Sequence, residues 1–200
     1  MEQIEKALSP QESLRVIQNT IDLAKRSAQE NGFHFLLWGW LIVIASIANW
    51  YLIMNPIYPQ PSIVWMIMVV VGMPASLIRE WLRAKKKEHS GNVIHKWYGL
   101  TWLGFGVSMV ISMPFAQRSG LSPIPFILVL TGFATFMSGL LLNFRPLLFG
   151  AAVIWACGLW CLFLAPMQHL LMQAAAAAFG YLIPGYLLNH QTRTSDVPRP

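Results

Sequence analysis

Residues 33–54 read FHFLLWGWLIVIASIANWYLIM, a run of 22 residues that contains no Asp, Glu, Lys or Arg. An apolar run of 18 or more residues indicates a membrane-spanning helix, because a helix rises about 1.5 Å per residue through a hydrocarbon core about 30 Å thick. Similar runs recur along the rest of the chain. We therefore predict an all-α integral membrane protein with six spans: Phe33–Met54, Ser62–Ile78, Trp97–Ala116, Pro123–Leu142, Pro146–Ala165 and Met167–Leu188.

The composition supports this fold class. Hydrophobic residues make up 56% of the chain and charged residues only 11%, whereas soluble domains carry about 25% charged residues. Most of the net charge of +6 lies in one inter-helix loop, RAKKKEHSGNVIHK at 83–96. Its RAKKKEH part at 83–89 can also attract anionic lipid headgroups. We therefore expect the lipid bilayer as a partner, and no nucleic acid.

The distribution of Lys and Arg predicts the orientation. Cytoplasmic flanks of membrane spans carry an excess of these residues. If the N-terminus is inside, thirteen of the fourteen lie on the inner side and only Arg118 lies outside. We expect a multi-pass protein of the bacterial cytoplasmic membrane with both termini in the cytoplasm.

The stretch SPQESLRVIQNTIDLAKRSAQENG (9–32) has the pattern of an amphipathic helix. Ser9 can cap the helix, Pro10 suits its first turn, and Glu12 completes a capping box. We expect Asn31-Gly32 to end or bend the helix before the first span. Apolar residues recur at intervals of three and four and form what we call the docking seam: Leu14, Ile17, Ile21, Ala24 and Ala28.

The docking seam suits another helix better than it suits a lipid surface. Helices that lie on membranes usually carry many Lys or Arg on one face and Trp or Phe on the other. Residues 1–30 hold five acidic residues, four basic residues and no aromatic residue. A narrow seam that ends in alanines favours close approach of a helix. Residues 9–30 would then dock a protein partner, the chain's own cytoplasmic loop or a second copy; alternatively, they only orient the first span.

The chain divides into a cytoplasmic amphipathic helix at 1–32, a transmembrane domain at 33–190 and a short cytoplasmic tail at 191–200. Within the transmembrane domain, three hairpin repeats are suggested by PASLIRE (74–80), SGLLLNF (138–144) and PGYLLNH (184–190). These motifs follow Gly39, Gly104 and Gly150 by 35, 34 and 34 residues. Such copies would be related by an axis along the membrane normal; chance similarity within a small apolar alphabet is the alternative.

Small residues and prolines indicate how the spans pack. Pro74 and Pro184 lie inside spans two and six and predict helix kinks. Matching kinks in repeats can mark a transporter site, although proline is common in membrane helices. The run AAAAA at 174–178 predicts a centrally packed sixth span. Small residues at a spacing of four permit close helix contact: Gly72 and Ser76, Ala134 and Ser138, Ala176 and Gly180.

We find no residue pattern that predicts chemistry. His34, His95 and His190 would lie at three helix ends, but there is no HExxH or CxxC motif to indicate a metal site. Glu80 adjoins Arg79, where we expect a solvated ion pair. No Asp, Glu, Lys or Arg falls inside a predicted span, and this disfavours ion-coupled transport. We therefore predict a protein that is not an enzyme, with no catalytic residue, no cofactor and no metal site.

The run ENGFHFLLWGWLIVIASI (30–47), with the closing YLIPGYLLN (181–189), resembles small six-span membrane proteins of unknown function in Bacteroidota-type bacteria. The resemblance covers most of the chain. It implies proteins associated with neighbouring winged-helix regulators, which would suit a cytoplasmic docking helix. Two function classes follow. The first is a non-enzymatic membrane protein that docks or regulates a partner through its N-terminal helix. The alternative is a small transporter or channel for a neutral or apolar solute.

Overall fold

The computed structural model describes the backbone of residues 10–85 and 93–195. For residues 10, 13–31, 83–84, 93–95 and 190–195 the side chains lie outside the description. The described part is all-helical, and six of its helical segments are long and apolar enough to cross a membrane: Gly32–Met54, Ile63–Leu82, Lys96–Arg118, Ile124–Leu141, Arg145–Phe163 and Gln168–Asn189. The six predicted spans are confirmed as helices, and their ends differ from the predictions by a few residues.

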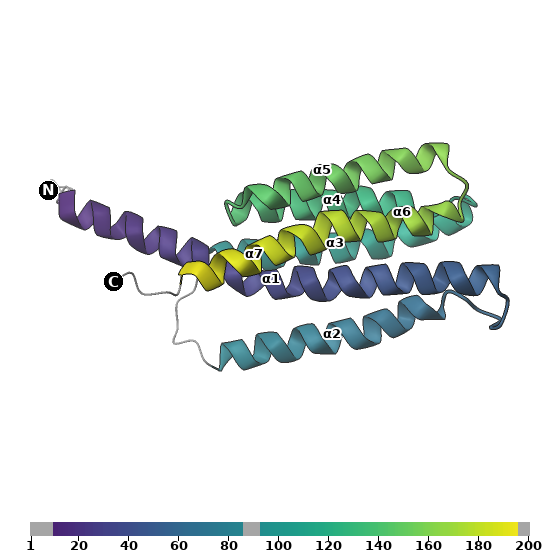
Figure 1. Ribbon diagram of the computed structural model, residues 1–200, viewed down its shortest axis with the longest axis horizontal. Coiled ribbons are helices and arrows are strands. Elements are labelled where there is room, and N and C mark those ends of the chain that lie inside the picture. Colours follow the sequence, from purple (N-terminus) through teal and green to yellow (C-terminus); the bar gives the residue numbers. More distant parts are fainter. Residues whose placement is uncertain (1–9, 86–92, 196–200) are drawn as a thin grey trace, which may run out of the picture.

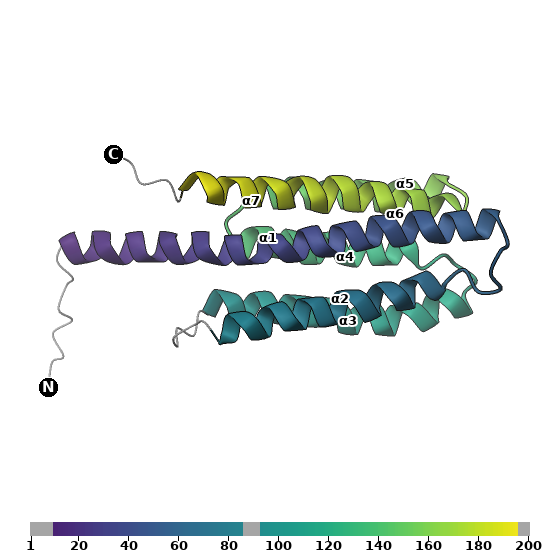
Figure 2. The same ribbon diagram turned by 60° about the horizontal axis from the view of Figure 1, so that its bottom comes forward.

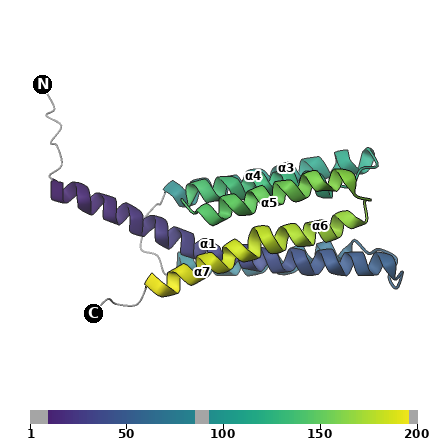
Figure 3. The same ribbon diagram turned by 45° about the horizontal axis from the view of Figure 1, so that its top comes forward.

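The helices form two layers of three. Helix α1 (Pro10–Met54) lies between α2 (Ile63–Ala84) and the sixth span, whereas α4 (Ile124–Leu141) lies between α3 (Val93–Arg118) and α5 (Arg145–Trp160). Figure 3 shows the two layers edge on; in Figure 2, α2 and α3 overlap on one side of the view although they belong to different layers. The layers meet mainly where α5 packs against the sixth span.

The two ends of the bundle differ in what they carry. Figure 1 shows that α1 begins and α7 (Ile183–Ser195) ends on the same side, which we call the terminal end. The opposite, distal end carries the connection from α1 to α2 and the turn after α5. The terminal end therefore also carries the short connection between α4 and α5.

The turns follow from local backbone chemistry. Asn143 adopts a positive φ of 49° after α4, and Phe144 N–H donates to Gly139 O at 2.9 Å while Asn143 N–H donates to Leu140 O at 3.1 Å. This is the Schellman pattern, which satisfies carbonyl groups left over at a helix end and favours Gly or Asn in the left-handed conformation. Gly120, with φ of 64°, ends α3 in the same way.

The sixth span is the most buried of the six, as the alanine run predicts, with more than half of its apolar window inside the bundle. It consists of α6 (Gln168–Ala177), a π-helical turn (Ala178–Leu182) and α7. Pro184 follows the π-helical turn. Because proline has no N–H to donate, the α-helical ladder is interrupted at this point. Ile183 N–H instead donates to Ala178 O, five residues back.

Close packing between helices relies on small residues, as predicted. Gly180 lies against Gly150 and Ile154, and Gly39 lies against Leu182 and Tyr181. Bilayers supply little hydrophobic drive for helix association, so such close contacts provide much of the stabilisation. All six residues of the predicted small-residue pairs are buried or half-buried: Gly72, Ser76, Ala134, Ser138, Ala176 and Gly180.

An aromatic cluster connects α3 to the layer that contains α1. The ring centroid of Trp102 lies 6.1 Å from that of Phe35 on α1 and 6.5 Å from that of Tyr181 in the π-helical turn. The Phe35 and Tyr181 centroids are 5.5 Å apart, with their rings edge to face. Edge-to-face pairs contribute about 0.5–1.5 kcal/mol beyond area burial, so the cluster adds to the packing of α3 against α4 in holding α3 to the bundle.

The three predicted hairpin repeats pack unequally. Gly39 and Gly150 both make close interhelix contacts, whereas a Cβ added to Gly104 would meet no described atom within 4 Å. Helices α2 and α3 have little buried surface, while α4 and the sixth span have much more. Common descent of the hairpins stays a prediction.

Candidate functional site

The N-terminal helix continues well beyond the first span. Of the predicted end or bend at Asn31-Gly32, the end is wrong, because α1 runs without interruption from Pro10 to Met54. Figure 3 shows that α1 nevertheless changes direction where its purple part meets the bundle. Gly32 is buried, and Leu188 of α7 lies 3.4 Å from the position of its Cβ. Residues 10–31 therefore extend the helix by about 33 Å, at 1.5 Å per residue. Figure 1 shows this extension in purple, projecting past the rest of the bundle.

The side chains of the docking seam lie outside the described residues, as does Ser9 of the predicted capping box. The backbone places the five seam positions on one face of the projecting helix, because residues three and four apart are neighbours on a helix surface. The structure thus shows that the seam positions belong to a helix: Leu14, Ile17, Ile21, Ala24 and Ala28. That their side chains contact a partner stays a prediction.

A His–Glu pair connects α1 to α2 near the terminal end. His34 Nε2 lies 2.9 Å from Glu80 Oε1, and the two side chains are 16% and 39% exposed. The guanidinium of Arg79 lies 4.0 Å from the centre of the Phe33 ring. The Glu80 carboxylate thus contacts a residue on another helix, a partner that the sequence did not predict. The second span runs to Leu82 and contains both charged residues, so the prediction of uncharged spans is wrong.

Further contacts in the middle of α2 hold it to α1. Trp38 Nε1 donates to Ser76 Oγ at 3.2 Å. A Cβ on Gly72 would lie 2.9 Å from both Leu41 Cδ1 and Trp38 Cη2. Most other apolar side chains of α2 are exposed, as expected of a helix that faces lipid. The described contacts between α2 and α1 therefore come from one face of α2, the face that carries Gly72, Ser76 and Glu80.

The two predicted kink residues do not share a crevice. Pro74 lies inside α2, which continues on both sides of it, and its side chain is exposed on the outside of the bundle. Pro184 is buried, and its Cγ lies 3.0 Å from the position of a Cβ on Gly150. A transport site formed between matching kinks would need the two prolines to face a common space. The structure places Pro74 on the outside of the bundle and Pro184 in its interior.

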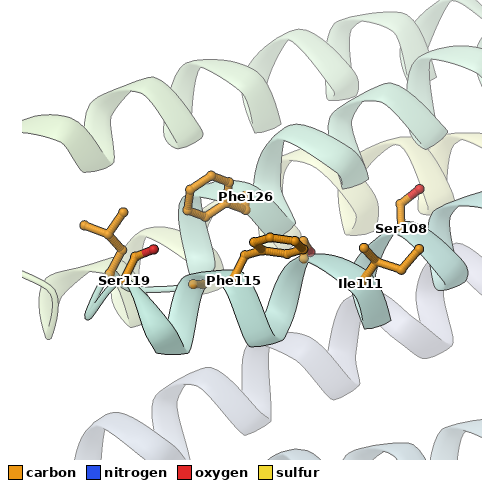
Figure 4. Close-up of a pocket in the computed structure, with 8 residues that line it drawn as sticks. Ser108, Ile111, Phe115, Ser119 and Phe126 are labelled. Atoms are coloured by element: carbon orange, nitrogen blue, oxygen red, sulfur yellow. The ribbon is translucent and has the colours of Figure 1, made fainter.

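A shallow groove of about 390 Å³ lies between α3 and α4 toward the distal end. Figure 4 shows Phe115 and Phe126 facing each other across it, with Ser108 and Ser119 at either end. Its lining also includes Ile111, Ser112 and Ala116 of α3 and Leu121 of the turn that follows α3. The groove opens on the outside of the bundle and involves neither Pro74 nor Pro184.

Polar side chains buried in the bundle were not anticipated from the sequence. Thr135 Oγ1 donates to Thr131 O and Ser138 Oγ donates to Ala134 O, each at 2.8 Å, so these hydroxyls are satisfied within α4. His169 is buried near the distal end, where its Nε2 lies 2.9 Å from Cys161 O and 3.2 Å from Leu164 O. This imidazole therefore closes the turn after α5 by satisfying carbonyl groups that a helix end leaves unpaired.

The described side chains hold no cluster of three His, Cys, Asp or Glu that would ligate a metal ion. His95 and His190, which we grouped with His34 at three helix ends, have side chains outside the description. The chain matches no protein-family model, and no curated protein or solved structure is significantly similar to it.

Proposed function

We propose that this protein is a non-enzymatic multi-pass membrane protein that recruits or regulates a protein partner through residues 9–30. The observation that supports this most is the uninterrupted course of α1 from Pro10 to Met54. A helix that leaves the bundle without a break holds its far end at a fixed distance from the membrane. About 33 Å of such a helix, at 1.5 Å per residue, carries a surface that a soluble protein can reach.

The chemistry of the seam favours a helix as its binding partner. Ile17 and Ile21 supply the largest apolar surface, and Ala24 and Ala28 allow a second helix to approach closely. Full burial of one Ile side chain contributes about 1.5–3 kcal/mol. Two such residues therefore supply on the order of 100-fold or more in affinity, since 1.4 kcal/mol corresponds to a factor of ten. We propose a partner that offers an amphipathic helix with a matching narrow apolar face.

We further propose that the terminal end faces the cytoplasm of a bacterial cell, so that the projecting helix reaches cytosolic partners. Thirteen of fourteen Lys and Arg residues fall on that side if the chain crosses six times, and such an excess is typical of cytoplasmic flanks. The shared end of α1 and α7 in Figure 1 is what an even number of crossings requires. A location in the bacterial inner membrane rests on the sequence resemblance.

The test of docking compares two double variants in native membranes. Ile17→Asp with Ile21→Asp places charges in the seam. Asn19→Asp with Gln29→Asp adds the same charge on the polar face of the same helix. We expect short-range crosslinking followed by mass spectrometry to lose its cytosolic partner in the first variant and to keep it in the second.

Two results would contradict the proposal. If both variants retain the partners of the unmodified chain, the seam is not a docking surface. If the unmodified chain crosslinks through this segment only to itself, residues 9–30 associate with a second copy and no separate partner is recruited. Equal membrane insertion of all variants, measured by extraction with carbonate, is the required control.

A further inference from the structure

The distal half of the bundle buries polar atoms that have no partner. His169 is 6% exposed, Gln173 is 5% exposed and Ser46 is fully buried. Among the described residues, His169 Nδ1, Gln173 Oε1 and Ser46 Oγ have no hydrogen-bond partner. An unsatisfied buried polar group costs about 1–3 kcal/mol. Three such atoms in one part of a membrane-spanning bundle therefore require an explanation.

The contacts of His169 define the chemistry of its free nitrogen. Its Nε2 faces the carbonyl oxygens of Cys161 and Leu164, at 2.9 and 3.2 Å. Carbonyl oxygens only accept hydrogen bonds, so Nε2 carries the proton. In the neutral imidazole Nδ1 then holds a lone pair and acts as an acceptor. Gln173 Oε1 is also an acceptor.

The two acceptors lie on one face of the same helix. His169 and Gln173 are four residues apart on α6, a spacing that makes their side chains neighbours. Each is unpaired, so neither receives a hydrogen bond from the other residue. A molecule that carries two donors complements this pair.

Ser46 lies at about the same depth on the neighbouring helix. Gly39 of α1 contacts Leu182 and Tyr181 of the sixth span, and the two segments run antiparallel. Seven residues further along α1, Ser46 therefore lies opposite the part of α6 that holds Gln173. A hydroxyl both donates and accepts, so Ser46 can complete the coordination of a ligand that bridges the helices.

The ligand class follows from the charge and the hydrogen-bonding chemistry of the three side chains. None of the three side chains carries a negative charge, and an unpaired cation inside a bundle costs several kcal/mol. We propose that His169 Nδ1, Gln173 Oε1 and Ser46 Oγ bind a small neutral molecule with two hydrogen-bond donors. One water molecule is the smallest that satisfies both acceptors, and buried waters typically make two to four such bonds. The site is independent of the docking helix.

Solid-state NMR of the full chain in lipid bilayers tests this directly. With ¹⁵N-labelled histidine, the His169 resonances are assigned by their loss in His169→Phe. We expect the Nε2–H tautomer, an Nδ1 shift typical of a hydrogen-bonded acceptor, and magnetisation transfer to Nδ1 from water. Transfer from carbon-bound protons of a co-purified molecule identifies a small polar solute as the donor instead of water. An Nδ1 shift typical of a free lone pair, or transfer from the Gln173 amide alone, overturns the proposal.

Matched glutamine variants separate the site from general packing. Gln173→Met keeps a similar volume and removes one acceptor, so we expect the water-to-Nδ1 transfer to fall at least twofold. Gln168→Met changes an exposed glutamine at the start of the same helix and should leave the transfer unchanged. Ser46→Ala removes only a hydroxyl and should also reduce it. Transfer that is equal in the unmodified chain, Gln173→Met and Ser46→Ala overturns the proposal.

Discussion

Gly150 and Gly180 lie so close that a Cβ on Gly150 would be 2.5 Å from the Gly180 carbonyl oxygen. This contact joins α5 to the π-helical turn of the sixth span, which is where the two layers of the bundle meet. A real Cβ cannot occupy that position. Residue 150 must therefore remain glycine, or the two helices must move apart.

Gly150→Ala should therefore destabilise the bundle by about 1–3 kcal/mol, the usual cost of overpacking a well-packed site. Gly104→Ala is the control, because it is the equivalent position of the suggested repeat and no described atom lies within 4 Å of its Cβ. Alanine is also the better helix former by about 0.5–1 kcal/mol. We expect thermal unfolding in detergent at a lower temperature for Gly150→Ala, and at an equal or higher temperature for Gly104→Ala. Equal effects of the two variants would refute the close contact.

The His34–Glu80 pair predicts energetic coupling between α1 and α2. Glu80→Gln and His34→Asn should each destabilise the fold, and a double-mutant cycle should give an interaction energy of about 0.5–2 kcal/mol, as contacting residues do. The control cycle combines Glu80→Gln with His169→Asn at the other end of the bundle. Distant sites should be additive within about 0.5 kcal/mol. A His34–Glu80 coupling no larger than the control would show that the 2.9 Å contact contributes nothing to stability.

An unbroken α1 predicts a long distance between its ends. Spin labels at Gln11 and Tyr51, both exposed, are 40 residues apart and should be about 60 Å apart at 1.5 Å per residue. A right-angled break at Gly32 would shorten this to about 40 Å by the same rise per residue. Pulsed electron paramagnetic resonance in lipid nanodiscs distinguishes the two distances. A narrow peak near the shorter value would remove the main support for the docking proposal.

Much of the fold was predictable from the sequence, because length and apolarity alone identify a membrane span. The end of the second span was missed for a physical reason. Arg79 lies over the Phe33 ring and Glu80 contacts His34. A partner on another helix compensates for burial of a charged group, and no pattern within α2 reveals that partner.

The buried polar site was less predictable. His169 and Gln173 have helical spacing beside the alanine run, so the sequence places them on one face of the most buried span. Their burial depends on the turn after α5, where His169 contacts the carbonyl oxygens of Cys161 and Leu164. Long-range geometry of that kind cannot be read from residue types. The docking seam was predicted from periodicity alone.

The central claim is that six helices cross the bilayer and leave the projecting helix on the same side as the end of α7. Single-cysteine variants on a background without Cys157 and Cys161 test it with a thiol reagent that does not cross membranes. Gln60→Cys and Ser119→Cys at the distal end should react in intact cells. Lys85→Cys and Gln11→Cys should react only after the membrane is opened. Reaction of Gln11→Cys and Gln60→Cys from the same side would contradict the crossing of the first span and, with it, the proposed arrangement.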